Sequence, residues 1–180
     1  LVAVGRLAPV KRFDRVIRAA VEARGQVPDL ELDIIGQGPL HGELRDQIAA
    51  AGASGWIRLR GRVSDAELID AYRSAWLVVS GSIAEGWGLS LTEGAACGTP
   101  CVATDISGHR SSVRAGTSGV LVPPERLGAT IVEVVNDPGR LDRLRSGALE
   151  WATSLSWDAS ALGLTEALRD EVVAHRRRGR

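Results

Sequence analysis

Hydrophobic residues along the chain fall into two alternating patterns, short apolar runs and longer stretches with helical spacing. The run at 2–4 ends at Gly5 and predicts a strand, whereas the apolar residues of 13–21 recur every three or four positions and predict an amphipathic helix. Strands are predicted at 2–4, 30–35, 56–59, 76–80, 101–103 and 120–122. Helices are predicted at 13–21, 40–48, 90–96, 127–135, 141–152 and 159–174, and a capping box of Ser64 and Glu67 opens another.

This order of elements predicts an α/β domain. Strands that alternate with helices form parallel βαβ units, and the strand at 76–80 is apolar until its last residue, as is typical of a strand covered on both faces. We therefore expect residues 1–180 to form one domain, a doubly wound, Rossmann-like parallel sheet of about six strands with helices on both faces. Segment 108–116 is expected to be irregular, with room for one helical turn. For His109, a solvated loop position is favoured over a contact with a bound ligand.

The composition excludes several classes of protein. The 22 basic and 22 acidic residues cancel, whereas nucleic-acid binders normally carry a basic excess. The apolar runs are far shorter than the roughly 20 residues that a membrane span needs. Cys97 and Cys101 form neither a disulfide framework nor a metal site and are expected to be small buried hydrophobes. We expect a cytoplasmic protein with no nucleic-acid partner and at most peripheral contact with the inner face of the membrane.

Two features concern the ends of the chain. The sequence contains no Met, from which we expect a piece of a longer protein. Residues 175–180 form a basic tail. A disordered cationic end is favoured over a contact with anionic lipid or RNA, because one short cluster on a neutral domain binds weakly.

Candidate chemistry is expected in the loops that follow the strands, because ligands of open parallel sheets bind beyond the carboxyl ends of the strands. That rule selects loops 5–11, 36–39, 61–63 and 81–90. In the first of them Arg6 and Lys11 precede a helix, an arrangement that suits a diphosphate, although two solvated surface charges are the alternative. Lys11 is the only lysine among the 22 basic residues.

The glycine-rich loop 36–39 invites comparison with a dinucleotide-binding fingerprint. Its spacing, Gly36-x-Gly38-x-x-x-Gly42, is one residue too long, and Pro39 stands where the helix should begin. A turn is therefore favoured over a nicotinamide site, and a dinucleotide-dependent oxidoreductase is the weaker alternative function.

Loop 81–90 carries the strongest signal. Gly86 and Gly88 flank Trp87 and leave backbone amides accessible, and the helix that follows directs its positive end to the same space. Glu85 and Glu93 bracket this turn, and carboxylates accept hydrogen bonds from the vicinal hydroxyls of sugars and riboses.

Helix capping is the competing interpretation of these carboxylates. Ser82 with Glu85, and Ser90 with Glu93, both have the spacing of a capping box. The two boxes cannot both open one helix. If Ser90 caps the helix, Glu85 remains in the loop without a capping role.

Together these loops resemble the C-terminal, donor-binding domain of retaining glycosyltransferases of family four, which adopt the GT-B fold. The resemblance covers nearly the whole chain and rests on five motifs in order. They are Gly5-Arg6-x4-Lys11, Ile35-Gly36-Gln37-Gly38-Pro39, Glu85-x7-Glu93 continuing through Ala96-Cys97-Gly98-Thr99-Pro100, Gly116-x-x-Gly119-x-x-Val122-Pro123-Pro124, and Ser156-Trp157. One departure is Ser111, which replaces a glutamate common in that family and puts any role borrowed for this position in doubt.

The resemblance implies roles for individual residues. Arg6 and Lys11 would stabilise the diphosphate leaving group and Glu85 would bind a donor-sugar hydroxyl, so these three form the expected catalytic set. Glu93 would bind the ribose. The base would lie near Arg62 and Val63, with Gly38 and Pro39 close to it. The expected substrate-binding residues are Gly5, Arg6, Lys11, Gly38, Pro39, Arg62, Val63, Glu85, Gly86, Trp87, Gly88, Leu89, Ser90 and Glu93.

The resemblance also implies the role of the whole chain. It would be the C-terminal half of a two-domain, hexosyl-type glycosyltransferase that uses a UDP-sugar or GDP-sugar with retention of configuration. No metal or other cofactor is expected. The acceptor would be bound mainly by an N-terminal domain that these residues do not include, so the isolated chain is expected to transfer little or no sugar. A non-catalytic nucleotide-sugar-binding module is the alternative.

Overall fold

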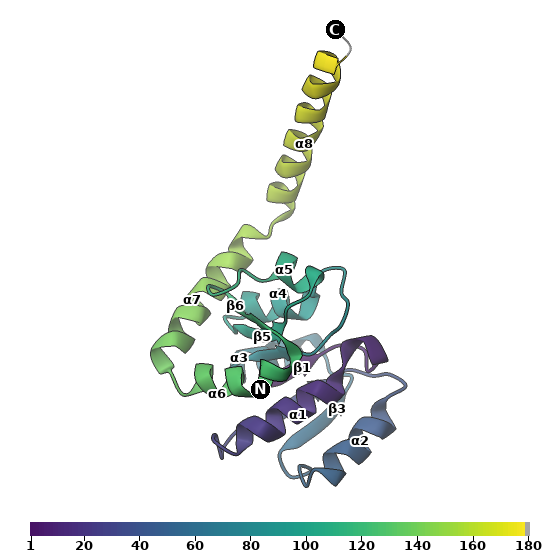
Figure 1. Cartoon of the computed structure of the whole chain (residues 1–180), viewed down its shortest axis with the longest axis vertical. Coiled ribbons are helices and arrows are strands. Elements are labelled where there is room, and N and C mark those ends of the chain that lie inside the picture. The colour runs from purple at the N-terminus through teal and green to yellow at the C-terminus, as the bar shows by residue number, and fades with distance from the viewer. Residues whose placement is uncertain (179–180) are drawn as a thin grey trace.

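The computed structural model describes residues 1–178 and contains one six-stranded sheet (Figure 1). The strand order is β3-β2-β1-β4-β5-β6, and every neighbouring pair is parallel. The doubly wound α/β fold predicted from the sequence is thereby confirmed. The strands are β1 (Val2–Val4), β2 (Leu32–Ile35), β3 (Ile57–Gly61), β4 (Val78–Ser80), β5 (Cys101–Thr104) and β6 (Gly119–Val122).

Helices cover both faces of this sheet. Buried residues of α1 (Phe13–Arg24), α2 (His41–Ala50) and α6 (Leu127–Val135) pack into one hydrophobic cluster, and those of α3 (Asp65–Ser74) and α4 (Leu89–Ala96) pack into another. The remaining helical segments are η1 (Pro9–Lys11), α5 (Ser107–Ser112), η2 (Pro124–Arg126), α7 (Pro138–Ser154) and α8 (Trp157–Arg178).

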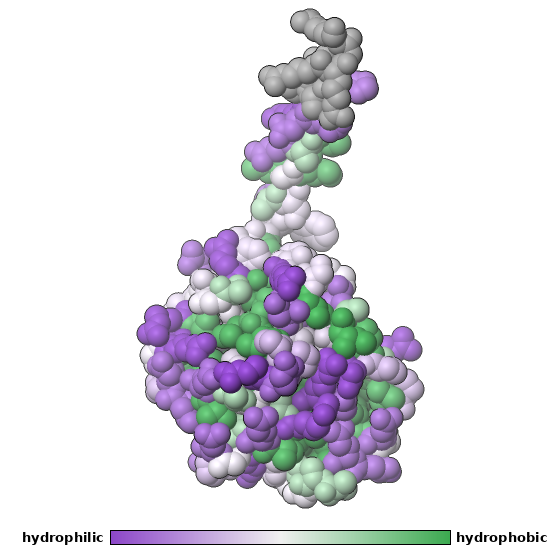
Figure 2. Space-filling model, in the orientation of Figure 1, coloured by the Kyte–Doolittle hydropathy of each residue, from purple (hydrophilic) through white to green (hydrophobic). Residues whose placement is uncertain are grey.

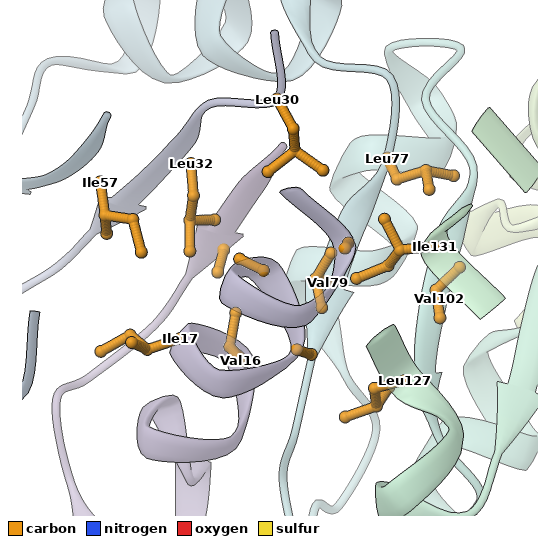
Figure 3. Packing of buried hydrophobic residues seen from close by; sticks show 14 of the residues in the cluster. Val16, Ile17, Leu30, Leu32, Ile57, Leu77, Val79, Val102, Leu127 and Ile131 are labelled. Carbon is orange, nitrogen blue, oxygen red and sulfur yellow. The ribbon is translucent and has the colours of Figure 1, made fainter. Parts of the chain in front are cut away.

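Alternate residues of each central strand supply these two clusters. Val79 and Val102 face the α1 and α6 side, whereas Val78 and Cys101 face the α3 and α4 side. This alternation follows from the period of two along a strand. Figure 3 shows Ile17 of α1 on the side of Leu32 and Ile57, and Ile131 of α6 beside Leu77 and Val79, all in the larger cluster. Burial raises the pKa of Cys101, and neither cysteine forms a disulfide.

The observed boundaries differ from the predicted ones where tertiary packing overrides the local pattern. Strands β2 and β4 begin at Leu32 and Val78, two residues later than predicted. Leu30 and Leu77 are buried without belonging to a strand, because burial of an apolar side chain does not require strand pairing. The segment predicted to be irregular contains helix α5. The capping box of Ser64 and Glu67 is confirmed, since Ser64 Oγ accepts from the Glu67 amide while Glu67 accepts from the Ser64 amide.

Helix α8 projects away from the sheet and shows both hydrophobic and hydrophilic residues along its length (Figures 1 and 2). It is longer than the predicted 159–174. Within the predicted basic tail 175–180, residues 175–178 belong to this helix, contrary to the expected disordered end, and residues 179–180 lie outside the described part of the chain. Among the described residues, no helix combines the length and apolarity required to cross a membrane.

The end of β2 approaches the end of β1 so closely that only glycine fits there. Gly36 has φ +141, and a Cβ at this position would lie 1.9 Å from the Gly5 carbonyl oxygen. The backbone of Gly36 is also fixed by its amide, which donates to the Gly61 carbonyl at 2.8 Å. The loops after β1, β2 and β3 are therefore joined through their backbones.

We expect Gly36→Ala to lower the free energy of unfolding by more than about 2 kcal/mol, because it combines a backbone clash with an unfavourable φ. Gly42→Ala is the matched control. Gly42 lies in α2, and a Cβ on it would have no neighbouring atom within 4 Å, so alanine there should stabilise the chain by about 0.5 kcal/mol. Denaturant titration measures both, and an unchanged stability of Gly36→Ala would contradict the close packing.

Candidate functional site

The candidate site lies where the direction of chain winding reverses, between β1 and β4. Strand β1 pairs with β2 on one side and with β4 on the other, so the loops that follow these strands leave in different directions. Ligands of open α/β sheets bind at such a point. Two hollows open here, and both include Val4 and Gly5 at the carboxyl end of β1.

The first hollow, of about 340 Å³, brings together most of the residues predicted for diphosphate and sugar binding. Residues from three separate segments form its walls. They are Val4, Gly5, Lys11, Glu85, Trp87, Gly88, Leu89, Ser90 and Glu93. Gly86 is exposed and is outside this set.

An ion pair between Lys11 and Glu85 crosses this hollow. Lys11 Nζ lies 2.7 Å from Glu85 Oε1, and the two side chains are 26% and 14% exposed. Ser82 Oγ also donates to Glu85 Oε1, at 2.7 Å. Two donors therefore share one carboxylate oxygen. Among the described residues no donor approaches the second oxygen, Oε2, which leaves it available to a ligand.

The backbone after η1 bends sharply to place Lys11 at the hollow. Arg12 adopts a left-handed conformation with φ 48, the only non-glycine residue with positive φ among those described. Its guanidinium donates twice to Asp14, at 2.8 Å in each case, and this hydrogen bonding lowers the pKa of Asp14. The bidentate pair stabilises the bend between η1 and α1.

The second hollow, of about 410 Å³, contains the residues predicted to lie near a base. Arg62 and Val63 line it, together with Gly36 and Gln37. Arg6, predicted to bind the diphosphate with Lys11, lines this second hollow and not the first. Gly38 and Pro39 do not appear in its walls. Gly38 packs against Leu7 instead, and a Cβ on it would lie 2.3 Å from the Leu7 carbonyl oxygen.

Helix α4 begins at Leu89, and its N-cap is Gly88, which has φ 95. The competing interpretation, a capping box of Ser90 and Glu93, is therefore wrong, because Ser90 already lies within the first turn. Glu93 instead accepts a hydrogen bond from the Tyr72 hydroxyl at 2.8 Å. Burial and the neighbouring Glu93 charge raise the pKa of Tyr72, so the phenol remains a donor.

The expectation that His109 is solvated is also wrong, because its side chain is fully buried. His109 lies in α5, and its Nδ1 is 2.7 Å from the Thr104 carbonyl oxygen. No sequence motif indicated three residues that form hydrogen bonds around the site, Tyr72, Thr104 and His109. The position of Tyr72 in an amphipathic helix indicates that its side chain is buried. That position does not indicate which residue accepts its hydrogen bond.

The sequence of the chain matches a known protein family. A family profile described as glycosyl transferases group 1 matches residues 1–151. The chain belongs to this family. The predicted resemblance is thus confirmed at the level of the family, and the same arrangement of loops should be sought in other group 1 glycosyl transferases.

Two curated relatives show how much of such a protein the chain represents. The D-inositol 3-phosphate glycosyltransferase of Thermobispora bispora is 37% identical over 178 residues, which cover 92% of this chain and 42% of the relative. The D-inositol 3-phosphate glycosyltransferase 1 of Catenulispora acidiphila is 36% identical over 190 residues, which cover 99% and 46%. The chain spans less than half the length of these two relatives.

Solved structures agree with the fold. The pneumococcal O-GlcNAc transferase GtfA, crystallised with UDP and GlcNAc, has a TM-score of 0.82 and 25% identity over 94% of this chain and 35% of GtfA. The C-terminal domain of the group 1 protein LpcC from Francisella tularensis has a TM-score of 0.76 and 21% identity, covering 86% of this chain and 84% of that domain. The latter likeness concerns the fold alone.

The contact between Tyr72 and Glu93 yields a prediction that is independent of any ligand. Tyr72→Phe removes only a hydroxyl and should lower the free energy of unfolding by about 1 kcal/mol. In a double-mutant cycle with Glu93→Gln the two changes should be coupled by about 1 kcal/mol. Ser74→Ala is the control on the same helix, because its hydroxyl bonds only the Ala71 carbonyl. If Ser74→Ala and Tyr72→Phe were equally coupled to Glu93→Gln, the contact between Tyr72 and Glu93 would be contradicted.

Proposed function

We propose that residues 1–180 form the donor-binding half of a retaining, hexosyl-type glycosyltransferase with the GT-B fold. The observation that carries this proposal is the meeting of Lys11, Glu85 and the beginning of α4 in one hollow at the reversal of the sheet. Cation, carboxylate and helix N-terminus together suit a ligand with both anionic and hydroxyl groups, as a nucleoside-diphosphate sugar has.

The diphosphate would be held by Arg6, Lys11 and the amides at the start of α4. A sugar–diphosphate bond breaks with negative charge developing on the leaving group, and fixed positive groups directed at that charge lower the barrier. Lys11 carries three N–H donors. One can stay on Glu85 while others reach phosphate oxygens, so the same ammonium would connect the sugar-binding carboxylate to the leaving group. We propose that these groups act without a metal.

The carboxylates of Glu85 and Glu93 would each bind one sugar ring of the donor. Glu85 Oε2 would accept from a sugar hydroxyl, and Glu93, held by Tyr72, would accept from the ribose. The base would occupy the neighbouring hollow beside Arg62 and Val63. The crystal of GtfA contains UDP, and the donor proposed for this chain is likewise a UDP-sugar, with a GDP-sugar as the second candidate.

The wider assignments extend this proposal. The chain would serve as the C-terminal half of a cytoplasmic two-domain enzyme, with the acceptor bound mainly by the other half and with at most peripheral contact with a membrane. A non-catalytic binding module would tolerate loss of the charged set. Arg6, Lys11, Glu85 and Glu93 are all present, which favours an enzyme.

Lys11→Ala tests the proposed diphosphate contact. In the full-length enzyme it should reduce turnover by about 10²–10³-fold, the usual effect of losing one charge-stabilising donor, and it should weaken UDP binding in calorimetry. Arg45→Ala is the control, because Arg45 is exposed on α2 and pairs with its neighbour Asp46. Unchanged affinity and rate for Lys11→Ala would refute the assignment. Tighter binding of NAD than of UDP or GDP would favour the oxidoreductase alternative.

The proposed division of labour between two halves has a separate test. The 180-residue chain should bind the nucleoside diphosphate and yet transfer little or no sugar. Calorimetry measures the first property, and release of UDP from UDP-sugar in the presence of candidate acceptors measures the second. Robust transfer by these residues alone would show that the acceptor site is already complete.

A further inference from the structure

A line of buried hydrogen bonds lies beneath the loop that carries Glu85. It starts at His109 in α5 and passes through Thr104 at the end of β5 and Ser82 after β4. His109, Thr104 and Ser82 are each no more than 1% exposed. None of them lines the hollow that would hold the donor.

The donor of every hydrogen bond in this line is fixed by chemistry. His109 Nδ1 faces the Thr104 carbonyl at 2.7 Å, and because a carbonyl only accepts, Nδ1 carries the hydrogen. The Thr104 hydroxyl donates to the Ser82 carbonyl at 2.6 Å. The Ser82 hydroxyl in turn donates to Glu85 Oε1 at 2.7 Å.

The other nitrogen of His109 ties the line to the neighbouring strand. Nε2 lies 3.3 Å from Ser80 Oγ, at the last residue of β4. Burial lowers the pKa of His109, so the neutral ring leaves Nε2 as an acceptor. The Ser80 hydroxyl lies 3.3 Å from both Nε2 and Ser82 Oγ, and its single hydrogen serves one of these acceptors at a time. His109 therefore bridges the carboxyl ends of β4 and β5 directly below the loop.

Backbone contacts hold the same loop from the side of α5. A Cβ on Gly108 would lie 2.2 Å from the Glu85 carbonyl oxygen, and a Cβ on Gly88 would lie 3.2 Å from His109 Cδ2. The helix thus touches the loop at Glu85 and again where α4 begins. With both ends fixed, the orientation of the Glu85 side chain depends on its own hydrogen bonds.

Those hydrogen bonds reach only one of the two carboxylate oxygens of Glu85. Oε1 accepts from both Ser82 and Lys11, while Oε2 has no donor among the described residues. Ser82 is the neutral, buried donor of the two, so its bond to Oε1 does not depend on Lys11. If a diphosphate drew Lys11 away, Oε1 would keep the Ser82 donor and Oε2 would remain without one.

We propose that Ser82 and Thr104, anchored by His109, are positioning residues that orient Glu85 toward the donor sugar. This inference rests on the function proposed above. These residues act on the sugar through Glu85 and do not touch the nucleotide. Their loss should therefore diminish recognition of the sugar while recognition of the nucleoside diphosphate is retained.

Paired titrations separate these two effects. Calorimetry of the 180-residue chain compares UDP with UDP-glucose and with UDP-N-acetylglucosamine, and GDP with GDP-mannose. The pair in which the sugar adds most affinity for the wild-type chain is then used for the variants. Glu85→Gln sets the loss expected when the carboxylate itself is removed.

Ser82→Ala and Thr104→Val should weaken nucleotide-sugar binding about 10-fold, the usual effect of losing a hydrogen bond to a charged group or its direct support. Binding of the nucleoside diphosphate should stay within about twofold. Thr104→Ser keeps the hydroxyl and should restore the wild-type affinity. Ser118→Ala is the control, because Ser118 is 3% exposed but precedes β6, at the amino ends of the parallel strands and away from the hollow at their carboxyl ends.

The outcomes are distinguishable. If the wild-type chain binds no nucleotide or nucleotide-sugar, the proposed function fails and this inference fails with it. If it binds them and the variants keep the full sugar contribution, only the positioning role is refuted. Equal weakening of nucleotide binding and nucleotide-sugar binding would reveal a merely structural role and overturn the proposal as well.

The role of His109 as the anchor has a separate test. Ring ¹⁵N NMR should show His109 with hydrogen on Nδ1 alone, and hydrogen on Nε2 alone would contradict the line of hydrogen bonds.

Discussion

The reversal of winding between β1 and β4 is the constraint on which the site depends. Helix α1 leaves β1 toward one face of the sheet, and α4 leaves β4 toward the other. The two loops therefore part and leave an opening at the sheet edge. Within this opening Lys11 and Glu85 come into contact although 74 positions separate them. Parallel pairing of β1 with β4 brings about this encounter.

Closely packed backbone borders the opening, and an ion pair lines it. The approach of Gly36 to Gly5 brings the loops after β1 and β2 together without intervening side chains. Above them, Lys11 and Glu85 neutralise one another at partly buried positions where a lone charge would be unfavourable. The zero net charge of the chain is thus compatible with a strongly polar site, because its charges are local and complementary.

The sequence predicted what local patterns determine. Strand β1 and helix α6 have the predicted bounds because periodicity and flanking turns mark them. The strand-end rule selected loops that contribute to two hollows, and most of the predicted diphosphate and sugar residues line one of them. Their roles stay predictions. Contacts between distant segments were not predictable in the same way. His109 becomes buried because α5 packs on the loop after β4, and no periodicity in a six-residue helix indicates that. Glu93 meets Tyr72 only because α3 and α4 are neighbours on one face.

The single lysine has a practical consequence for labelling chemistry. Lys11 is the only side chain of the sequence that carries a primary amine, and it stands at the mouth of the hollow, about one quarter exposed. An acylating reagent therefore marks one side-chain amine in this sequence, and peptide mapping distinguishes it from any modified α-amino group. Protection of that amine from the reagent reads out occupancy of the hollow directly by mass spectrometry, without a reaction product or a chosen acceptor.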